Sequence, residues 1–150
     1  NLPLDGVDVL PVLRGERGVC PERCWQWNRY SPVIASNAAI RDGDWKLVRP
    51  AISETMGVPD IGHLKTSMVN PEYFIENGIF KGDPERDIPA PPPAQLFNIA
   101  DDPQESRDRA AGHPDKVAAL MAKLETWFEA VEADRCSIED EWVLNPGSGW

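Results

Sequence analysis

The segment NAAIRDGDWKLV, Asn37 to Val48, decides the fold of this chain. At its centre stands Asp42-Gly43, a pair that favours a two-residue type I′ turn, because both central residues of that turn have positive φ. This turn predicts an antiparallel hairpin with the facing pairs Arg41 and Asp44, Ile40 and Trp45, Ala39 and Lys46, and Ala38 and Leu47. The pairing gathers the apolar side chains on one face of the hairpin and the opposite charges on the other.

Two more strands are predicted on either side of the hairpin. Cys24 to Tyr30, CWQWNRY, is aromatic and is flanked by Pro21 and Pro32, which favours a short strand over a helix. Gln95 to Ile99, QLFNI, forms the second of these strands, and Ala100 to Ser106 forms the turn that ends it.

A long helix is predicted from Pro114 to about Asp134. Pro114 suits the first helical position, and Asp115 favours the positive end of the helix dipole. An apolar stripe recurs along it at steps of three and four residues: Val117, Leu120, Met121, Leu124, Trp127, Phe128 and Val131. The predicted fold class is therefore α+β, a small antiparallel sheet of three to four strands packed on one long C-terminal helix, with a long irregular insertion.

The chain has 150 residues, 41% of them hydrophobic, which is enough for one core of ordinary size. One domain is therefore expected, with five segments. These are a lead-in helix or turn over 1–22, the strand and hairpin over 23–49, an irregular Pro- and Gly-rich insertion over 50–93, the strand and long helix over 94–134, and an acidic tail over 135–150. Insertions of that length are usually functional or disordered.

The formal net charge of -10 argues against nucleic acid as a partner, because binding to phosphates requires clustered Lys and Arg. It also disfavours anionic membrane surfaces. No apolar run approaches the roughly 20 residues of a transmembrane helix, and no targeting signal is visible. The sequence leaves the compartment open between periplasmic, secreted and cytoplasmic locations.

The residue types that usually carry catalysis are few and scattered. Cys20, Cys24 and Cys136 form an odd set, so at least one thiol is unpaired; one bridge stays possible, but free thiols are favoured over a bridge or a zinc site. His63 and His113 have no nucleophile or metal partner in view, and His113 beside Pro114 suits a capping or surface role. No phosphate-binding glycine loop, serine elbow or paired-histidine motif occurs. The sequence predicts no catalytic residue and no metal ligand.

Three stretches, in this order, resemble the closing segment of sulfatases. They are RDGDWKLV (Arg41 to Val48), LFNIADDPQESRD (Leu96 to Asp108) and HPDKVAALMAKLETW (His113 to Trp127). DGVDVLPVLRG, Asp5 to Gly15, is similar to the stretch that precedes them in that family, so the likeness runs from about Leu2 to Asp134. The resemblance implies the C-terminal subdomain of a sulfatase in the alkaline-phosphatase-like superfamily. In that architecture a larger α/β catalytic domain lies upstream.

The family hydrolyses sulfate esters with a formylglycine, made in a Cys/Ser-x-Pro-x-Arg motif, and with a divalent cation, usually calcium. No cysteine or serine of this sequence begins that motif, since Cys20 is followed directly by Pro21. No nucleophile or calcium ligand is therefore carried over, and the chain is expected to be inactive alone. The acidic groups Asp101-Asp102 and Glu139 to Glu141 are expected to be solvated residues of a turn and of the tail.

The segment that the resemblance places near a substrate cleft is Asn28, Arg29 and Tyr30. These residues would present a cation and hydrogen bonds to an anionic substrate at the cleft rim. The alternative, which is favoured, is that the arginine pairs with a neighbouring carboxylate at the sheet edge. Trp25, Trp27 and Trp45 would stack on sugars or, as favoured, pack in the core against the long helix.

The partners implied by the resemblance are the upstream catalytic domain and, through it, a sulfated small molecule or glycan. Two rival functions stay open. One is the same architectural part of a phosphonate or phosphodiester hydrolase. The other is a free-standing acidic interaction or carbohydrate-binding module.

Overall fold

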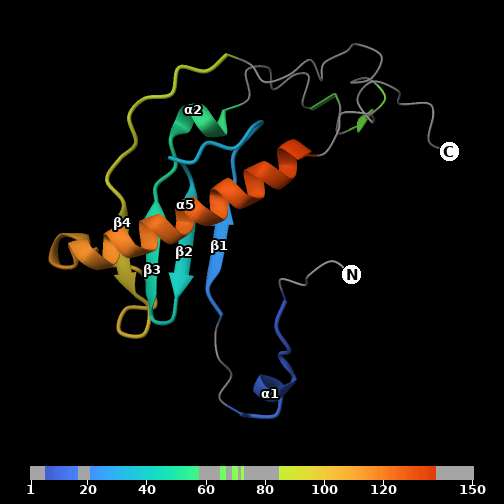
Figure 1. The fold of residues 1–150 in the computed structure, drawn as a ribbon. Helices are drawn as coiled ribbons and strands as arrows, with labels where there is room; N and C mark the ends of the chain where they lie inside the picture. The colour runs from blue at the N-terminus through green and yellow to red at the C-terminus, as the bar shows by residue number, and fades with distance from the viewer. Residues whose placement is uncertain are drawn as a thin grey trace.

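The computed structural model describes residues 6–16, 21–57, 65–66, 69–70, 72 and 85–137. Within these residues the elements are α1 (Leu10–Leu13), β1 (Arg23–Gln26), β2 (Ala38–Asp42), β3 (Trp45–Arg49), α2 (Ser53–Met56), β4 (Gln95–Asn98), the 3-10 turn η1 (Ala110–Gly112) and α5 (Pro114–Ser137). The described strands form a four-stranded antiparallel sheet in the order β1-β2-β3-β4, and α5 crosses one face of it (Figure 1). The predicted α+β fold is confirmed.

The core lies between α5 and the sheet face turned toward it. Side chains of a strand alternate between the two faces, so Ile40, Leu47 and Leu96 at matched register positions all point to the helix. Leu120 and Leu124, four residues apart on one side of α5, close the core from the other side. Val131 is 47% exposed. The far end of α5 extends beyond β1 in Figure 1, so the predicted apolar stripe is buried only along the part that crosses the sheet.

The hairpin register differs from the prediction. Asp42 pairs with Trp45, Ile40 with Leu47 and Ala38 with Arg49, so the two turn residues are Gly43 and Asp44. Gly43 has φ +58°, whereas Asp44 is not among the residues with positive φ. A turn with glycine at the first central position needs positive φ only there, whereas the predicted type I′ turn would also impose it on Asp42.

This shift moves the strands by two residues and therefore leaves each side chain on its predicted face. Ile40, Trp45 and Leu47 still share the face toward the helix. The predicted charge pair is lost, because Arg41 lies opposite Lys46 and its Nε donates to the Gly43 carbonyl at 3.1 Å. The face assignment was right and the facing pairs were wrong.

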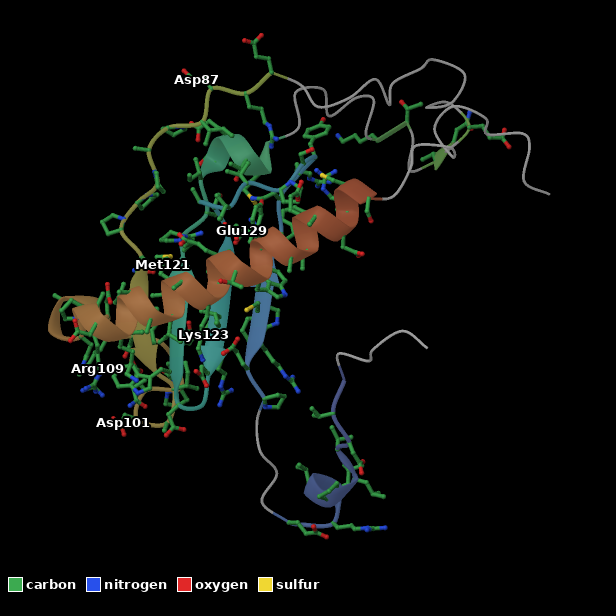
Figure 2. The ribbon with its side chains drawn as sticks, in the orientation of Figure 1. Asp87, Asp101, Arg109, Met121, Lys123 and Glu129 are labelled. Carbon is green, nitrogen blue, oxygen red and sulfur yellow. The ribbon has the colours of Figure 1, made fainter. Side chains whose placement is uncertain are left out.

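Ion pairs connect the helix to the sheet at both ends of the core. Lys123 donates to Asp42 at 2.6 Å and to Glu22 at 2.7 Å, and Figure 2 shows it on α5 over the sheet. The hydrogen bonds from Lys123 to Asp42 and then Glu22 raise its pKa above the ordinary lysine range. Arg49 donates to Glu125 at 2.5 Å. The two Lys123 pairs are exposed and contribute little stability each, so their effect is mainly to fix where the helix lies.

The sheet face opposite α5 carries a mixed surface. Trp25, Ala39 and Val48 form one row across it, and Arg23, Arg41, Lys46 and Phe97 form the next. Trp25 is 46% exposed and Trp27, just beyond the strand, is 52% exposed. Core packing of these two tryptophans was therefore a wrong prediction. Trp45 is partly buried against the core, where the His113 ring meets it edge-on at 4.9 Å between centroids.

Residues 6–16 stand apart from the sheet and helix. Figure 1 shows α1 beyond the end of the sheet that carries the turn between β2 and β3. Five aliphatic side chains of this segment are exposed: Val7, Val9, Leu10, Val12 and Leu13. Within the predicted lead-in segment the structure describes one short helix, α1, with Pro11 in its first turn.

Two predicted segments fall partly outside the described residues. An irregular segment was predicted for the insertion over 50–93, but the structure describes the helix α2 there. Ile52, just before this helix, and Thr55, within it, are buried. In the tail over 135–150, residues 135–137 continue α5. Among the described residues, no helix is both long and apolar enough to cross a membrane.

Replacing Gly43 by alanine tests the observed turn. At φ +58° an added Cβ costs about 1 kcal/mol, so Gly43→Ala should lower the free energy of unfolding by that amount in urea denaturation followed by circular dichroism. Gly112→Ala is the matched control, because that glycine has no positive φ and open space around it. Equal effects of the two changes would contradict the turn assignment.

Removing a buried leucine tests the packing of α5. Leu124 is 1% exposed, so Leu124→Ala should lower the free energy of unfolding by about 3 kcal/mol through lost burial and a cavity. The same change at Leu13, which is 78% exposed, should have little effect on unfolding. A small effect at Leu124 in the same denaturation experiment would show that the helix does not close this core.

Candidate functional site

The residues Asn28, Arg29 and Tyr30 follow β1 and lie together at one end of the sheet. Figure 1 shows the chain leaving β1 beside α2. The Arg29 amide donates to the Thr55 carbonyl of α2 at 3.0 Å, which fixes the segment to that helix. The predicted rim residues therefore occupy an ordered loop at the end of the sheet away from the hairpin turn.

The Asn28 side chain is turned into the fold. Its Oδ1 accepts from the Val33 amide at 3.0 Å and from Gln26 Nε2 at 3.1 Å. Its Nδ2 donates to Thr55 Oγ1 at 3.2 Å. Both polar atoms of the amide are used to shape the loop, so Asn28 acts here as a positioning residue.

A pair of buried hydroxyl groups, which was not predicted from the sequence, lies beneath this loop. Ser36 Oγ lies 2.7 Å from Thr55 Oγ1, and both residues are 0% exposed. Ser36 Oγ accepts from the Ile52 amide at 2.8 Å, and Thr55 Oγ1 donates to the Ile52 carbonyl at 2.8 Å. Buried polar groups are tolerated when they are hydrogen-bonded in this way. Isolated Ser and Thr residues far apart in sequence gave no signal of it.

The Arg29 guanidinium lies over an aromatic ring, and no described carboxylate pairs with it. Its guanidinium carbon lies 5.2 Å from the centroid of the Trp27 ring, within the range of a cation–π contact. Its Nε is buried and has no hydrogen-bond partner. No ion pair among the described residues involves Arg29, so the predicted alternative of a neighbouring carboxylate is not seen there.

Tyr30 is held in a strained backbone conformation. Its φ is +58°, which costs a residue with a Cβ about 1–2 kcal/mol. Arg86 donates to the carbonyls on both sides of it, to that of Arg29 at 3.0 Å and to that of Ser31 at 3.2 Å. The Arg86 guanidinium carbon also lies 5.8 Å from the Tyr30 ring. Strain that the surroundings maintain is often found at binding sites.

The other residues weighed for chemistry lie elsewhere. Asp102 was expected to be solvated but is 5% exposed. Burial by itself raises its pKa, and hydrogen bonds from the Arg107 amide and from Ser106 reverse this, so that its pKa lies below the ordinary value. Asp101 is exposed, and Figure 2 shows it near Arg109 beyond β4. Glu139 to Glu141 and His63 lie outside the described residues. With its hydrogen bonds to Ser106 and Arg107, the buried Asp102 carboxylate shapes the turn that follows β4.

The described part of the chain contains no candidate metal site, and its cysteines are free thiols. No group of three His, Cys, Asp or Glu side chains is placed there to hold a metal ion. Cys24 and Cys136 are free thiols, and Cys20 lies outside the described residues. Burial, followed by the nearby charge of Glu22, raises the pKa of the Cys24 thiol to about 11. A thiol with that pKa is a poor nucleophile near neutral pH.

No protein-family model matches the chain, and no curated protein matches it. The resemblance to sulfatases consequently stays a prediction from the quoted stretches of sequence.

The raised pKa of Cys24 predicts slow alkylation. At pH 8 the Cys24 thiol is almost entirely protonated, so iodoacetamide should modify the exposed Cys136 roughly tenfold faster or more. Trypsin cleavage after Arg23 and Arg135 separates the two cysteines for mass spectrometry. In urea the rates should converge, and equal rates in the folded chain would contradict the protected thiol.

Proposed function

We propose that this chain is the C-terminal part of a sulfatase-like hydrolase, where it supports the catalytic domain and borders its substrate cleft. The observation that carries the proposal is the agreement between the sequence resemblance and the fold. The three quoted stretches form the hairpin of β2 and β3, the strand β4 and the helix α5. Together they make the small antiparallel sheet with one long helix that the resemblance implies.

The exposed apolar surfaces support a partner domain. Residues 6–16 expose five aliphatic side chains and lie beyond the sheet, and Trp25 is exposed on the face opposite α5. Contiguous exposed apolar surface usually marks an interaction site. A domain packed against these surfaces would remove them from water.

The residues of this chain do not fit the two catalytic groups of the family. No cysteine or serine begins the motif that becomes formylglycine. The described residues contain no cluster of metal-ligating side chains that would take calcium. The chain's own contribution is therefore the wall of a cleft, with Arg29 and Tyr30 as the rim and Asn28 positioning them.

A free-standing carbohydrate-binding module is the second candidate function. The observation that favours it is the exposure of Trp25 and Trp27, which were expected in the core. A stable monomer that binds sulfated glycans without an upstream domain would support this candidate. A chain that stays soluble only in complex with a larger domain would exclude it.

The decisive test compares this chain alone with the same chain extended through its upstream reading frame. With an aryl sulfate and calcium, the chain alone should give no turnover, and the extended protein should hydrolyse the ester. The upstream sequence should contain Cys/Ser-x-Pro-x-Arg. A phosphonate monoester assayed in parallel separates the related hydrolase class.

Two results would overturn the proposal. Turnover of the aryl sulfate by the purified chain would place an active site inside it. An upstream sequence without the motif, in an extended protein inactive on the ester, would remove the catalytic domain that this part is proposed to support.

A further inference from the structure

We propose that two copies of this chain pair through their β1 strands, antiparallel and centred on Trp25, so that their two sheets join into one. This interface goes beyond the proposed function, because it needs no catalytic domain and leaves residues 6–16 available to one. The geometry that leads to it is a sheet with one closed edge and one open edge.

The β4 edge is closed by the segment that follows this strand. In an antiparallel sheet, alternate residues of an edge strand turn their N–H and C=O groups away from the neighbouring strand. On β4, the Leu96 amide donates to Asp108 Oδ1 at 3.0 Å, and its carbonyl accepts from the Arg109 amide at 2.8 Å. The Asn98 carbonyl accepts from the Asp102 amide at 2.8 Å. A further strand at this edge would have to break these bonds.

The β1 edge is open. The Trp27 amide donates to the Asn37 carbonyl at 3.2 Å, which lies on the side of β2. Backbone direction alternates along a strand, so Trp25 also bonds to β2, whereas Cys24 and Gln26 turn their N–H and C=O groups outward. No described residue forms a hydrogen bond with these outward backbone groups. They are a template for one added strand.

The strand that fits this edge best is β1 of a second copy. When Cys24 of each copy exchanges hydrogen bonds with Gln26 of the other, every outward group of β1 is used. Trp25, 46% exposed, then lies opposite Trp25 of the second copy in a non-hydrogen-bonded pair, where side chains approach most closely. Arg23 lies opposite Trp27 of the second copy, a pair that permits a cation–π contact. The edge is therefore complementary to itself, as a two-fold interface requires.

Neighbouring registers use the edge less well. A shift by two residues in one direction places Arg23 opposite Arg29 of the second copy, and like charges directly opposite each other are destabilising. The same shift in the other direction pairs Cys24 with Cys24 and carries Gln26 past the start of β1 of the second copy. The register centred on Trp25 avoids both faults.

The far end of α5 provides a second reason for a strand at this edge. This end extends beyond β1 in Figure 1, and Val131 there is 47% exposed. Val131 lies two turns after the buried Leu124, so it belongs to the helix side that faces the sheet. A strand added to β1 would continue the sheet beneath this end of the helix and cover Val131.

The first test measures association of the full chain from micromolar to millimolar concentration. Sedimentation should show a dimer that dissociates on dilution. In hydrogen–deuterium exchange, the Cys24 and Gln26 amides should exchange about tenfold more slowly in the dimer than in the dilute chain. The Leu96 amide is the matched control, because its bond to Asp108 exists in one copy and should protect it equally at both concentrations.

Matched variants locate the interface. Trp25→Lys sets two like charges opposite each other and should raise the dimer dissociation constant about tenfold or more. Val48→Lys changes the same sheet face in the inner strand β3, and Leu13→Lys changes the exposed helix α1; both should leave the constant unchanged. Circular dichroism establishes that each variant is folded.

A cysteine at the two-fold axis tests the register. The three native cysteines, Cys20, Cys24 and Cys136, are replaced by serine in this experiment. Cα atoms of a non-hydrogen-bonded pair lie about 4.5 Å apart, a separation that a disulfide can span. Trp25→Cys in this background should therefore form an intermolecular disulfide on mild oxidation. Arg23→Cys faces Trp27 of the second copy rather than itself and should not.

Three outcomes would overturn the inference. These are a monomer at millimolar concentration, a dimer that Leu13→Lys weakens and Trp25→Lys does not, or disulfides that form equally fast from the Arg23 and Trp25 variants. Each of them leaves the proposed function untouched, because that function is tested by the upstream sequence and by hydrolysis of the aryl sulfate.

Discussion

The turn at Gly43 and Asp44 is the constraint on which the rest of the structure depends. It sets the register of β2 against β3, and that register places Ile40 opposite Leu47 on the face covered by α5. Because Asp42 stays in the strand, its carboxylate is available to Lys123 of the helix. One glycine at positive φ thus fixes both the apolar match and the ion pair that locates the helix.

The same register determines the side-chain contacts at the other end of the sheet. β2 begins directly after Ser36 and Asn37, so the position of the hairpin fixes where these two side chains meet the loop after β1 and the helix α2. The buried Ser36 and Thr55 hydroxyls can be satisfied only if α2 returns to this point. The loop that carries Arg29 is ordered by these bonds, at the end of the sheet opposite the hairpin turn.

Local patterns predicted most of the fold and less of the candidate site. Alternation along the strands and the stripe from Val117 to Phe128 predicted the sheet face and the helix correctly. Side chains repeat with one fixed period in a strand and with another in a helix, so the sequence alone reveals both. The turn was misplaced by one residue, since the sequence Asp-Gly-Asp permits two turn types. Trp25 and Trp27 were assigned to the core on their apolarity, but one helix covers only one face of the sheet. The clamp of Arg86 on Tyr30 joins residues 56 apart in sequence, and no local pattern encodes it.

The distribution of charge shows how the fold uses its polar groups. Its cations around the core are used in pairs with carboxylates, and its buried carboxylate Asp102 is used to hold a turn. Its partly buried thiol is protonated at neutral pH. Each of these groups is engaged by the fold itself. Arg29 differs, because its guanidinium lies over the Trp27 ring and no carboxylate of the described residues pairs with it. A cation held in this way can donate hydrogen bonds to an anionic group.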